Sequence, residues 1–122
     1  MKLVGTIVPG LRQARELGYP TVNLSYELPA GTTLAHGVFV GTVTWDGEEG
    51  EESHLAAIVV GGNFRDDNPP KCEAYILDWS GDLYGRSVEF AIGELVRPLA
   101  HFDSLEALTA QIAADIEVIR GR

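Results

Sequence analysis

The stretch Gly37-Val38-Phe39-Val40-Gly41-Thr42-Val43-Thr44-Trp45 is the clearest strand in this sequence of 122 residues. It is rich in valine and threonine, whose branched side chains suit a pleated sheet. Asp46-Gly47 follows it directly, and this pair supplies the positive φ that a tight hairpin turn requires. The sequence therefore predicts a strand over 37–45 that ends in a hairpin.

Further strands are expected on both sides of this hairpin. The apolar runs that predict them are bounded by turn residues such as Pro9-Gly10 and Ser80-Gly81-Asp82. They cover Leu3–Val8, Leu55–Val60, Lys71–Trp79 and Ser87–Val96. Several short strands with Gly-rich turns are typical of a small barrel or sandwich, and closure into a barrel removes exposed edges. We therefore predict an all-β architecture in which residues 1–122 form a single domain.

The C-terminal segment changes from strand to helical periodicity. Apolar residues recur at steps of three or four, at Leu105, Leu108, Ile112, Ile116 and Ile119. Asp103-Ser104-Leu105-Glu106 fits a capping box in which Asp103 accepts from the first-turn amides. Gly121 can end the helix in a left-handed conformation. Because the apolar stripe needs a partner, we expect the helix to pack on the outer wall of the barrel.

Composition and charge limit the possible functions. Nine Lys and Arg residues against 18 Asp and Glu residues give a net charge of −9. This balance argues against a nucleic-acid-binding face, although a metal ion and backbone amides can still hold the phosphates of a nucleotide. The acidic run Glu48–Glu52 is interpreted as a solvated hairpin tip.

The remaining composition indicates a protein of a reducing compartment. The single cysteine, Cys72, excludes an intramolecular disulfide and a cysteine-cluster metal site. No run approaches 18 apolar residues, and the first residues lack the apolar core of a secretion signal. We therefore expect a cytoplasmic protein that binds no membrane and is monomeric.

Three common nucleotide-binding and catalytic motifs are absent from the sequence. It contains no phosphate-binding loop of the Gly-x4-Gly-Lys-Ser/Thr type, no Gly-x-Gly-x-x-Gly and no Gly-x-Ser-x-Gly elbow. His36, His54 and His101 stand far apart without metal-ligand spacing. We interpret each of them as a surface or hydrogen-bonded histidine.

Two features can carry chemistry. In Leu17-Gly18-Tyr19-Pro20-Thr21-Val22-Asn23-Leu24, Thr21 and Asn23 are two residues apart, so in an extended chain their oxygens lie on one side. Such oxygens can bind a hard cation, but spacing alone favours a turn with side-chain-to-backbone hydrogen bonds. Glu73, inside an apolar strand, is either a general base on a rigid element or an ordinary outward-facing residue, which the pattern alone favours.

These segments together resemble the ATP-dependent riboflavin kinases, the flavokinase family. The match runs over nearly the whole chain and keeps the family order of segments. The matching segments are Leu17–Leu24, Glu73-Ala74-Tyr75-Ile76-Leu77-Asp78, Asp82-Leu83-Tyr84-Gly85, Leu95-Val96-Arg97-Pro98, Phe102–Leu108 and Gln111-Ile112-x-x-Asp115. Each motif is weak alone, but in this order they form a specific signal.

The resemblance implies a six-stranded Greek-key β-barrel with the C-terminal α-helix packed outside. It also implies transfer of the γ-phosphoryl group of ATP to the 5′-hydroxyl of riboflavin, giving FMN and ADP with Mg²⁺ as cofactor. By carry-over, Glu73 takes the proton from that hydroxyl, and Thr21 and Asn23 bind the metal and the nucleotide. The resemblance further places Gly10, Arg15, Gly18 and Pro20 at the nucleotide and Arg97, Phe102 and Asp103 on the flavin side.

The chain departs from the family pattern in two loops. Arg12 and Ala14 stand where the first loop of the family has glycines, and the later loop is shortened to Val60-Gly61-Gly62-Asn63-Phe64. We therefore expect phosphate recognition in the first loop to depend on the side-chain charge of Arg12 and Arg15. The altered loops leave open a non-catalytic flavin- or nucleotide-binding module on the same barrel. An acidic protein-interaction domain is a third reading, but it does not explain the motif order. The adenylyltransferase domain of bacterial relatives has no counterpart here, so we expect no FAD synthesis.

Overall fold

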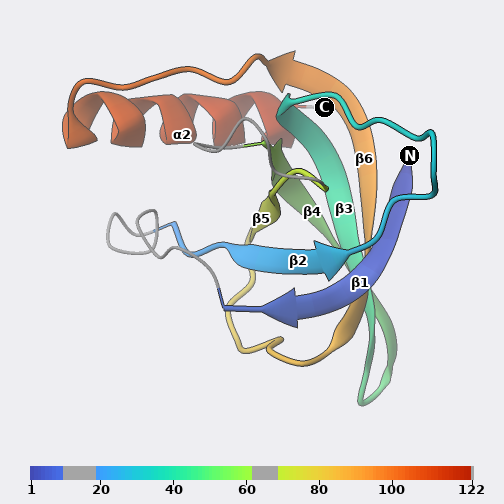
Figure 1. Ribbon diagram of the computed structural model, residues 1–122. Coiled ribbons are helices and arrows are strands. Elements are labelled where there is room, and N and C mark those ends of the chain that lie inside the picture. The colour runs from blue at the N-terminus through green and yellow to red at the C-terminus, as the bar shows by residue number, and fades with distance from the viewer. Residues whose placement is uncertain (10–18, 62–68, 122) are drawn as a thin grey trace.

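The computed structural model describes residues 1–9, 19–61 and 69–121, and within them the chain forms a closed antiparallel barrel (Figure 1). Its strands are β1 (Lys2–Val8), β2 (Val22–Tyr26), β3 (Gly37–Gly47), β4 (Gly50–Val60), β5 (Cys72–Ile76) and β6 (Ser87–Arg97). They are hydrogen-bonded in the order β1-β2-β5-β4-β3-β6. Strands β3, β4 and β5 are successive neighbours and β6 returns beside β3, which is a Greek-key arrangement. The expected barrel is confirmed, and the sandwich is excluded.

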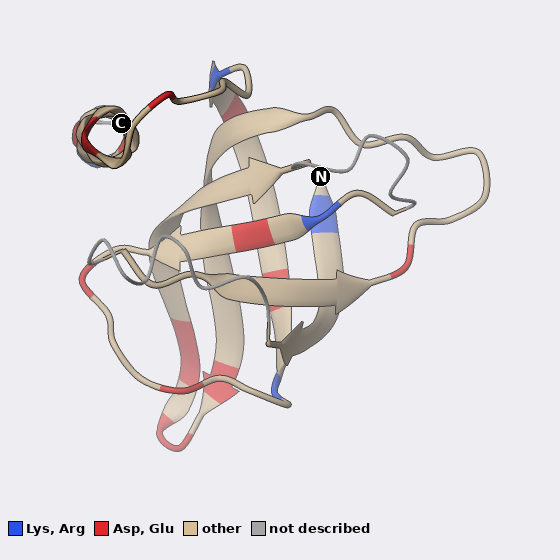
Figure 2. Ribbon diagram, turned by 60° about the vertical axis from the view of Figure 1, so that its left-hand side comes forward, with Lys and Arg blue, Asp and Glu red and all other residues tan. Residues whose placement is uncertain are grey.

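Strand β2 is the element that the apolar pattern did not delimit. Only its extended character was expected, because Asn23 and Ser25 interrupt the run of apolar residues. In the barrel, Leu24 and Tyr26 are buried inside. The hairpin of β3 and β4 is also longer than expected, since pairing continues to Gly47 opposite Gly50. The acidic run Glu48–Glu52 is exposed, as expected, although Glu51 and Glu52 belong to β4, and Figure 2 shows acidic residues clustered at this end of the hairpin.

Alternating side chains of all strands fill the barrel interior. The fully buried ones include Ile7, Val43, Ile58, Val60 and Phe90. Side chains of two long connections also pack on this core. Leu28 and Leu34 come from the β2–β3 connection, and Trp79 and Leu83 come from the β5–β6 connection.

Gly41 marks a point where two strands approach closely. A Cβ atom there would lie 2.3 Å from the Ala91 carbonyl oxygen and 2.4 Å from Cδ1 of Ile58. Only glycine leaves room for this approach of β3 and β6. The register of the same two strands shifts on either side of Phe39, as strand bending by bulges requires.

Helix α2 (Leu105–Arg120) lies outside the barrel, against β4 and β6, as expected (Figure 1). Ile119 is fully buried against Ala57 and Leu77, with Ile116 beside it. Leu105 is 58% exposed, whereas Leu108 and Ile112 are partly buried, so the expected apolar stripe is covered except at its first residue. The barrel wall does not extend under the first turn of the helix.

Both ends of α2 differ from the expected caps. The N-cap is Ser104 rather than Asp103, and its Oγ accepts from the Ala107 N–H at 3.1 Å. Gly121 ends the helix with φ −80° and ψ −2°, not in the left-handed region, and its N–H donates to the Glu117 carbonyl. The described part of the chain contains no helix long and apolar enough to cross a bilayer.

Candidate active site

The outer face of β2 and β5 brings the two chemical features of the sequence together. Asn23 on β2 is the register partner of Glu73 on β5, so their side chains leave the same face of the sheet. Thr21 precedes Asn23 by two residues and shares this face. The Thr21 hydroxyl donates a long hydrogen bond of 3.4 Å to Oε2 of Glu73. We call Thr21, Asn23 and Glu73 the outer-face cluster.

Glu73 owes its position to the alternation of β5. Its neighbours Cys72 and Ala74 point into the barrel and are buried. The carboxylate therefore points outward, with 20% of the side chain exposed, on a strand paired on both sides. A carboxylate that is rigidly held yet accessible has the properties of a general base.

Asn23 is buried but incompletely hydrogen-bonded. The residue is only 9% exposed. Its Oδ1 atom has no hydrogen-bond partner among the residues that the structure describes. Because an unpaired buried oxygen is costly, such an atom points to a missing donor or cation. The Thr21 hydroxyl on the same face adds a second oxygen, and oxygen ligands are those that Mg²⁺ prefers.

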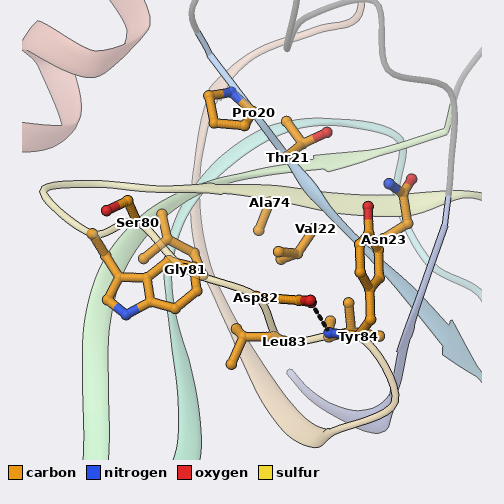
Figure 3. A pocket seen from close by; sticks show the side chains of 13 residues that line it. Pro20, Thr21, Val22, Asn23, Ala74, Ser80, Gly81, Asp82, Leu83 and Tyr84 are labelled. Carbon is orange, nitrogen blue, oxygen red and sulfur yellow. Dashed lines mark hydrogen bonds between the residues drawn. The ribbon is translucent and has the colours of Figure 1, made fainter.

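A cavity of about 350 Å³ adjoins this cluster. One side is the stretch from Pro20 to Asn23, and the other is the connection from Trp79 to Tyr84 (Figure 3). Apolar side chains of β1 and β5 complete the lining, at Ile7, Ala74 and Ile76. Thr21 thus lines the cavity and also donates a hydrogen bond to the Glu73 carboxylate, which lies outside the cavity.

The connection beside the cavity is held by specific contacts. Oδ1 of Asp82 accepts from the Tyr84 N–H at 2.8 Å, and the Gly85 N–H donates to the Ile7 carbonyl at 2.9 Å. The Trp79 ring meets Trp45 edge-on with 5.2 Å between ring centroids. Only the structure places Trp79 beside the site, although a tryptophan next to a turn could have been a signal.

Histidine 54 belongs to the same aromatic group. Its ring stacks on Trp45 at 5.0 Å, and its Nε2 lies 3.4 Å from Oε1 of Glu52. This is the hydrogen-bonded role expected from its isolated place in the sequence. Among the described residues, no group of three or more His, Cys, Asp or Glu side chains could hold a metal ion.

The residues expected on the flavin side lie elsewhere on the barrel. Arg97, at the end of β6, forms a two-pronged ion pair with Asp115 of α2, and its guanidinium lies 5.6 Å from the centre of the Phe102 ring. Asp103 is exposed. None of these three residues lines the cavity. The structure therefore joins Arg97 to Phe102 but not to the outer-face cluster, and their contact with flavin stays a prediction.

Several expected site residues lie outside the described part of the chain. They are Gly10, Arg12, Ala14, Arg15, Gly18 and residues 62–64 of the shortened loop.

Two other ionisable groups near β5 are unsuited to chemistry near neutral pH. Burial raises the pKa of the Cys72 thiol to about 12, with Glu73 adding to the effect. Burial also raises the pKa of Tyr26 to about 12, and its hydroxyl donates to the Pro70 carbonyl. Since a thiol reacts as its thiolate, Cys72 is a core residue and not a nucleophile.

The closed Greek-key barrel, the outer helix, and a carboxylate beside a hydroxyl and an amide oxygen are the features expected of a flavokinase-type domain. The model of the flavokinase family, described as riboflavin kinase, matches residues 1–121. The chain therefore belongs to the riboflavin kinase family.

Curated relatives agree with this assignment. The chain is 32% identical to human riboflavin kinase, with 97% of this chain and 77% of the human protein covered. It is 31% identical to the bifunctional riboflavin kinase/FMN adenylyltransferase of Mycoplasma pneumoniae, with 93% of this chain but 39% of that protein covered. For the RNA-binding riboflavin kinase RibR of Bacillus subtilis the identity is 32%, with 98% and 50% covered. The chain thus spans half the length or less of several relatives.

Solved structures show the same fold. A Streptococcus pneumoniae protein described as a macrolide-efflux protein superposes with a TM-score of 0.83 at 31% identity, covering 99% of this chain and 38% of the other. Riboflavin kinase from Trypanosoma brucei superposes with a TM-score of 0.72 at 24% identity, covering 98% and 74%.

Proposed function

We propose that this chain transfers the γ-phosphoryl group of ATP to the 5′-hydroxyl of riboflavin, giving FMN and ADP. Membership of the riboflavin kinase family supports riboflavin and ATP as the substrates. The observation that carries the mechanism is the register of Asn23 opposite Glu73, with Thr21 hydrogen-bonded to the same carboxylate. This register places a carboxylate base beside oxygen atoms that can bind a metal ion. Phosphoryl transfer depends chiefly on positioning of the reacting groups and on charge stabilisation.

Glu73 is the general base of the proposed reaction. Its carboxylate accepts the proton of the riboflavin 5′-hydroxyl as that oxygen forms a bond to the γ-phosphorus. The bond between the γ-phosphorus and the bridging oxygen breaks, and its electron pair leaves with ADP. The partly exposed position of Glu73 on β5 gives the hydroxyl access to the carboxylate.

Thr21 and Asn23 fit a magnesium ion carried by the nucleotide. Its protein ligands in this proposal are the Thr21 hydroxyl and Oδ1 of Asn23, the atom that lacks a partner in the described residues. Because Mg²⁺ usually keeps several waters and substrate oxygens, two protein ligands suffice. When bound, the ion neutralises charge on the phosphate oxygens.

The cavity is the proposed place of the adenosine. Its apolar floor and the partly buried Trp79 offer the surface that a flat base needs. Since Thr21 and Asn23 form part of the wall, a nucleoside held there directs its phosphates toward the outer-face cluster. The cavity then holds the adenosine, Thr21 and Asn23 hold the phosphates through the metal ion, and Glu73 lies beside the riboflavin hydroxyl.

Incubation with riboflavin, ATP and Mg²⁺, followed by separation of FMN from riboflavin, tests the proposal. FMN formation that requires all three components is the expected result. Saturable binding of riboflavin and ATP without FMN would instead support the non-catalytic binding module.

A further inference from the structure

A second polar side chain contacts the proposed base. Lys71, immediately before β5, places its Nζ 3.4 Å from Oε2 of Glu73. This is the same oxygen that accepts from Thr21. The side chains of Lys71 and Glu73 are 29% and 20% exposed. The ammonium therefore lies in the outer-face cluster, accessible to a substrate.

The backbone fixes Lys71 at this place. The Gly61 N–H donates to the Lys71 carbonyl at 2.7 Å, at the end of β4. The preceding Pro70 carbonyl accepts from the hydroxyl of Tyr26, which is buried in the core. These contacts fix the backbone from which the Lys71 side chain extends toward Glu73.

The other cations of the described residues are occupied away from this cluster. Lys2 pairs with Glu89, Arg86 donates to the Asp46 carbonyl, Arg97 pairs with Asp115, and Arg120 pairs with Asp78. Among the described Lys and Arg residues, Lys71 is thus the one whose partner belongs to the proposed site. A positive group beside Glu73 offsets the repulsion between this carboxylate and the phosphates of a bound nucleotide.

We propose that Lys71 binds the phosphoryl group during transfer, first as the γ-phosphate of ATP and then as the phosphate of FMN. This inference rests on the proposed function. A general base lies within about 3 Å of the hydroxyl that attacks, and that hydroxyl oxygen lies about 3 Å from the phosphorus. The γ-phosphorus is therefore some 5–6 Å from the carboxylate. Lys71, at 3.4 Å from that carboxylate, is within reach of the phosphate oxygens. With three N–H donors, the ammonium can contact Glu73 and a phosphate together.

Two series of affinities test the inference without turnover. Nucleotides are measured with Mg²⁺ but no flavin, and flavins are measured with no nucleotide. In Lys71→Met the affinity for ATP should fall about 10- to 100-fold, the range for a lost charged hydrogen bond, and the affinity for FMN should fall similarly. The affinities for ADP, adenosine and riboflavin should stay within about twofold, because these lack the phosphate in question.

Two variants provide controls. Lys2→Met makes the same substitution at the exposed pair with Glu89 and should change none of the affinities. Lys71→Arg keeps the charge and should restore most of the affinity for ATP and FMN.

Each outcome decides the inference. Unchanged ATP and FMN affinities would show that Lys71 is only a partner of Glu73. Loss for just one of the two ligands would overturn the idea that one lysine contacts the phosphoryl group on both sides of the reaction. If both affinities fall but no FMN is ever formed, the phosphate contact stands and the proposed function fails.

Discussion

Arg97 and Asp115 tie the last strand of the barrel to the outer helix. Nε of Arg97 donates to Oδ1 of Asp115 at 2.9 Å, and Nη2 donates to Oδ2 at 2.8 Å. The Gln111 amide donates to the same carboxylate at 2.9 Å. Asp115 is one of two buried residues of α2, and this pair therefore places a charged contact in the seam between helix and barrel.

Loss of this pair should destabilise the fold. In Arg97→Met the buried carboxylate of Asp115 loses its charged partner, and breaking a buried pair typically costs about 3–5 kcal/mol. We expect the free energy of unfolding, measured by urea denaturation, to fall by about 3 kcal/mol because Arg97 keeps some exposure to solvent. Arg120→Met removes an exposed pair with Asp78 and is the control, for which we expect a much smaller loss. Equal losses in both variants would contradict this account of Arg97.

Glu73→Gln tests the proposed base. The change keeps the shape of the side chain but removes its ability to accept a proton. We expect turnover to fall about 10²- to 10⁴-fold, the usual contribution of a general base. The thermal midpoint should change little, since the side chain lies on the outer face of β5. Nearly normal turnover in a folded variant would remove Glu73 from this role.

Thr21→Val and Asn23→Leu test the metal ligands. Each change removes an oxygen and keeps similar bulk, so the Mg²⁺-dependent part of ATP affinity should fall by about tenfold. Titration calorimetry of ATP with Mg²⁺ and with a chelator separates this part from the rest, and riboflavin is the control ligand. If riboflavin affinity fell as much as ATP affinity, the two residues would be holding the loop and not the metal.

Trp79→Ala tests the cavity. Removal of the ring should weaken adenosine, ADP and ATP alike, by about 5- to 100-fold, as loss of base–aromatic stacking does. This pattern differs from the one expected for Lys71, where only ATP is affected among the nucleotides. Trp79→Phe keeps an aromatic face and should retain most of the affinity. Unchanged adenosine affinity in Trp79→Ala would place the base outside the cavity.

The buried thiol of Cys72 should make the fold sensitive to alkaline pH. Its pKa is raised from about 9 to about 12 in the folded chain, so the unfolded chain loses this proton first as the pH rises. Stability from this group is complete below about pH 9 and is lost as the pH rises toward about 12. Urea denaturation at several pH values should show a shallower decline for Cys72→Ala than for the unaltered chain. Parallel declines would mean that the thiol does not ionise differently in the two states.

Local sequence patterns were sufficient for most of the fold. The valine- and threonine-rich stretch of β3 and the helical stripe of α2 appear where they were expected, because their periodicity reflects burial on one face. The pattern did not delimit β2, because the polar residues Asn23 and Ser25 interrupt its apolar run and hide its strand character. The caps of α2 also differed, since Ser104 and Asp103 are equally suited to capping and only the path of the chain chooses between them.

The candidate site was recognised as two separate motifs. The spacing of Thr21 and Asn23 predicted a shared side in an extended chain, and alternation along β5 placed Glu73 outward. Neither pattern predicted the contact between the two motifs, because Thr21 and Glu73 are 52 residues apart and meet only through the pairing of β2 with β5.

The sequence by itself determined five of the six strands, the outer helix and the family motifs, since local propensity and periodicity act over a few neighbouring residues. Only the tertiary structure decided which of these residues meet. Barrel closure set Asn23 opposite Glu73, and helix docking joined Arg97 to Asp115. Strand register and helix docking depend on packing of the whole core, so contacts between distant segments are fixed only when the barrel is complete.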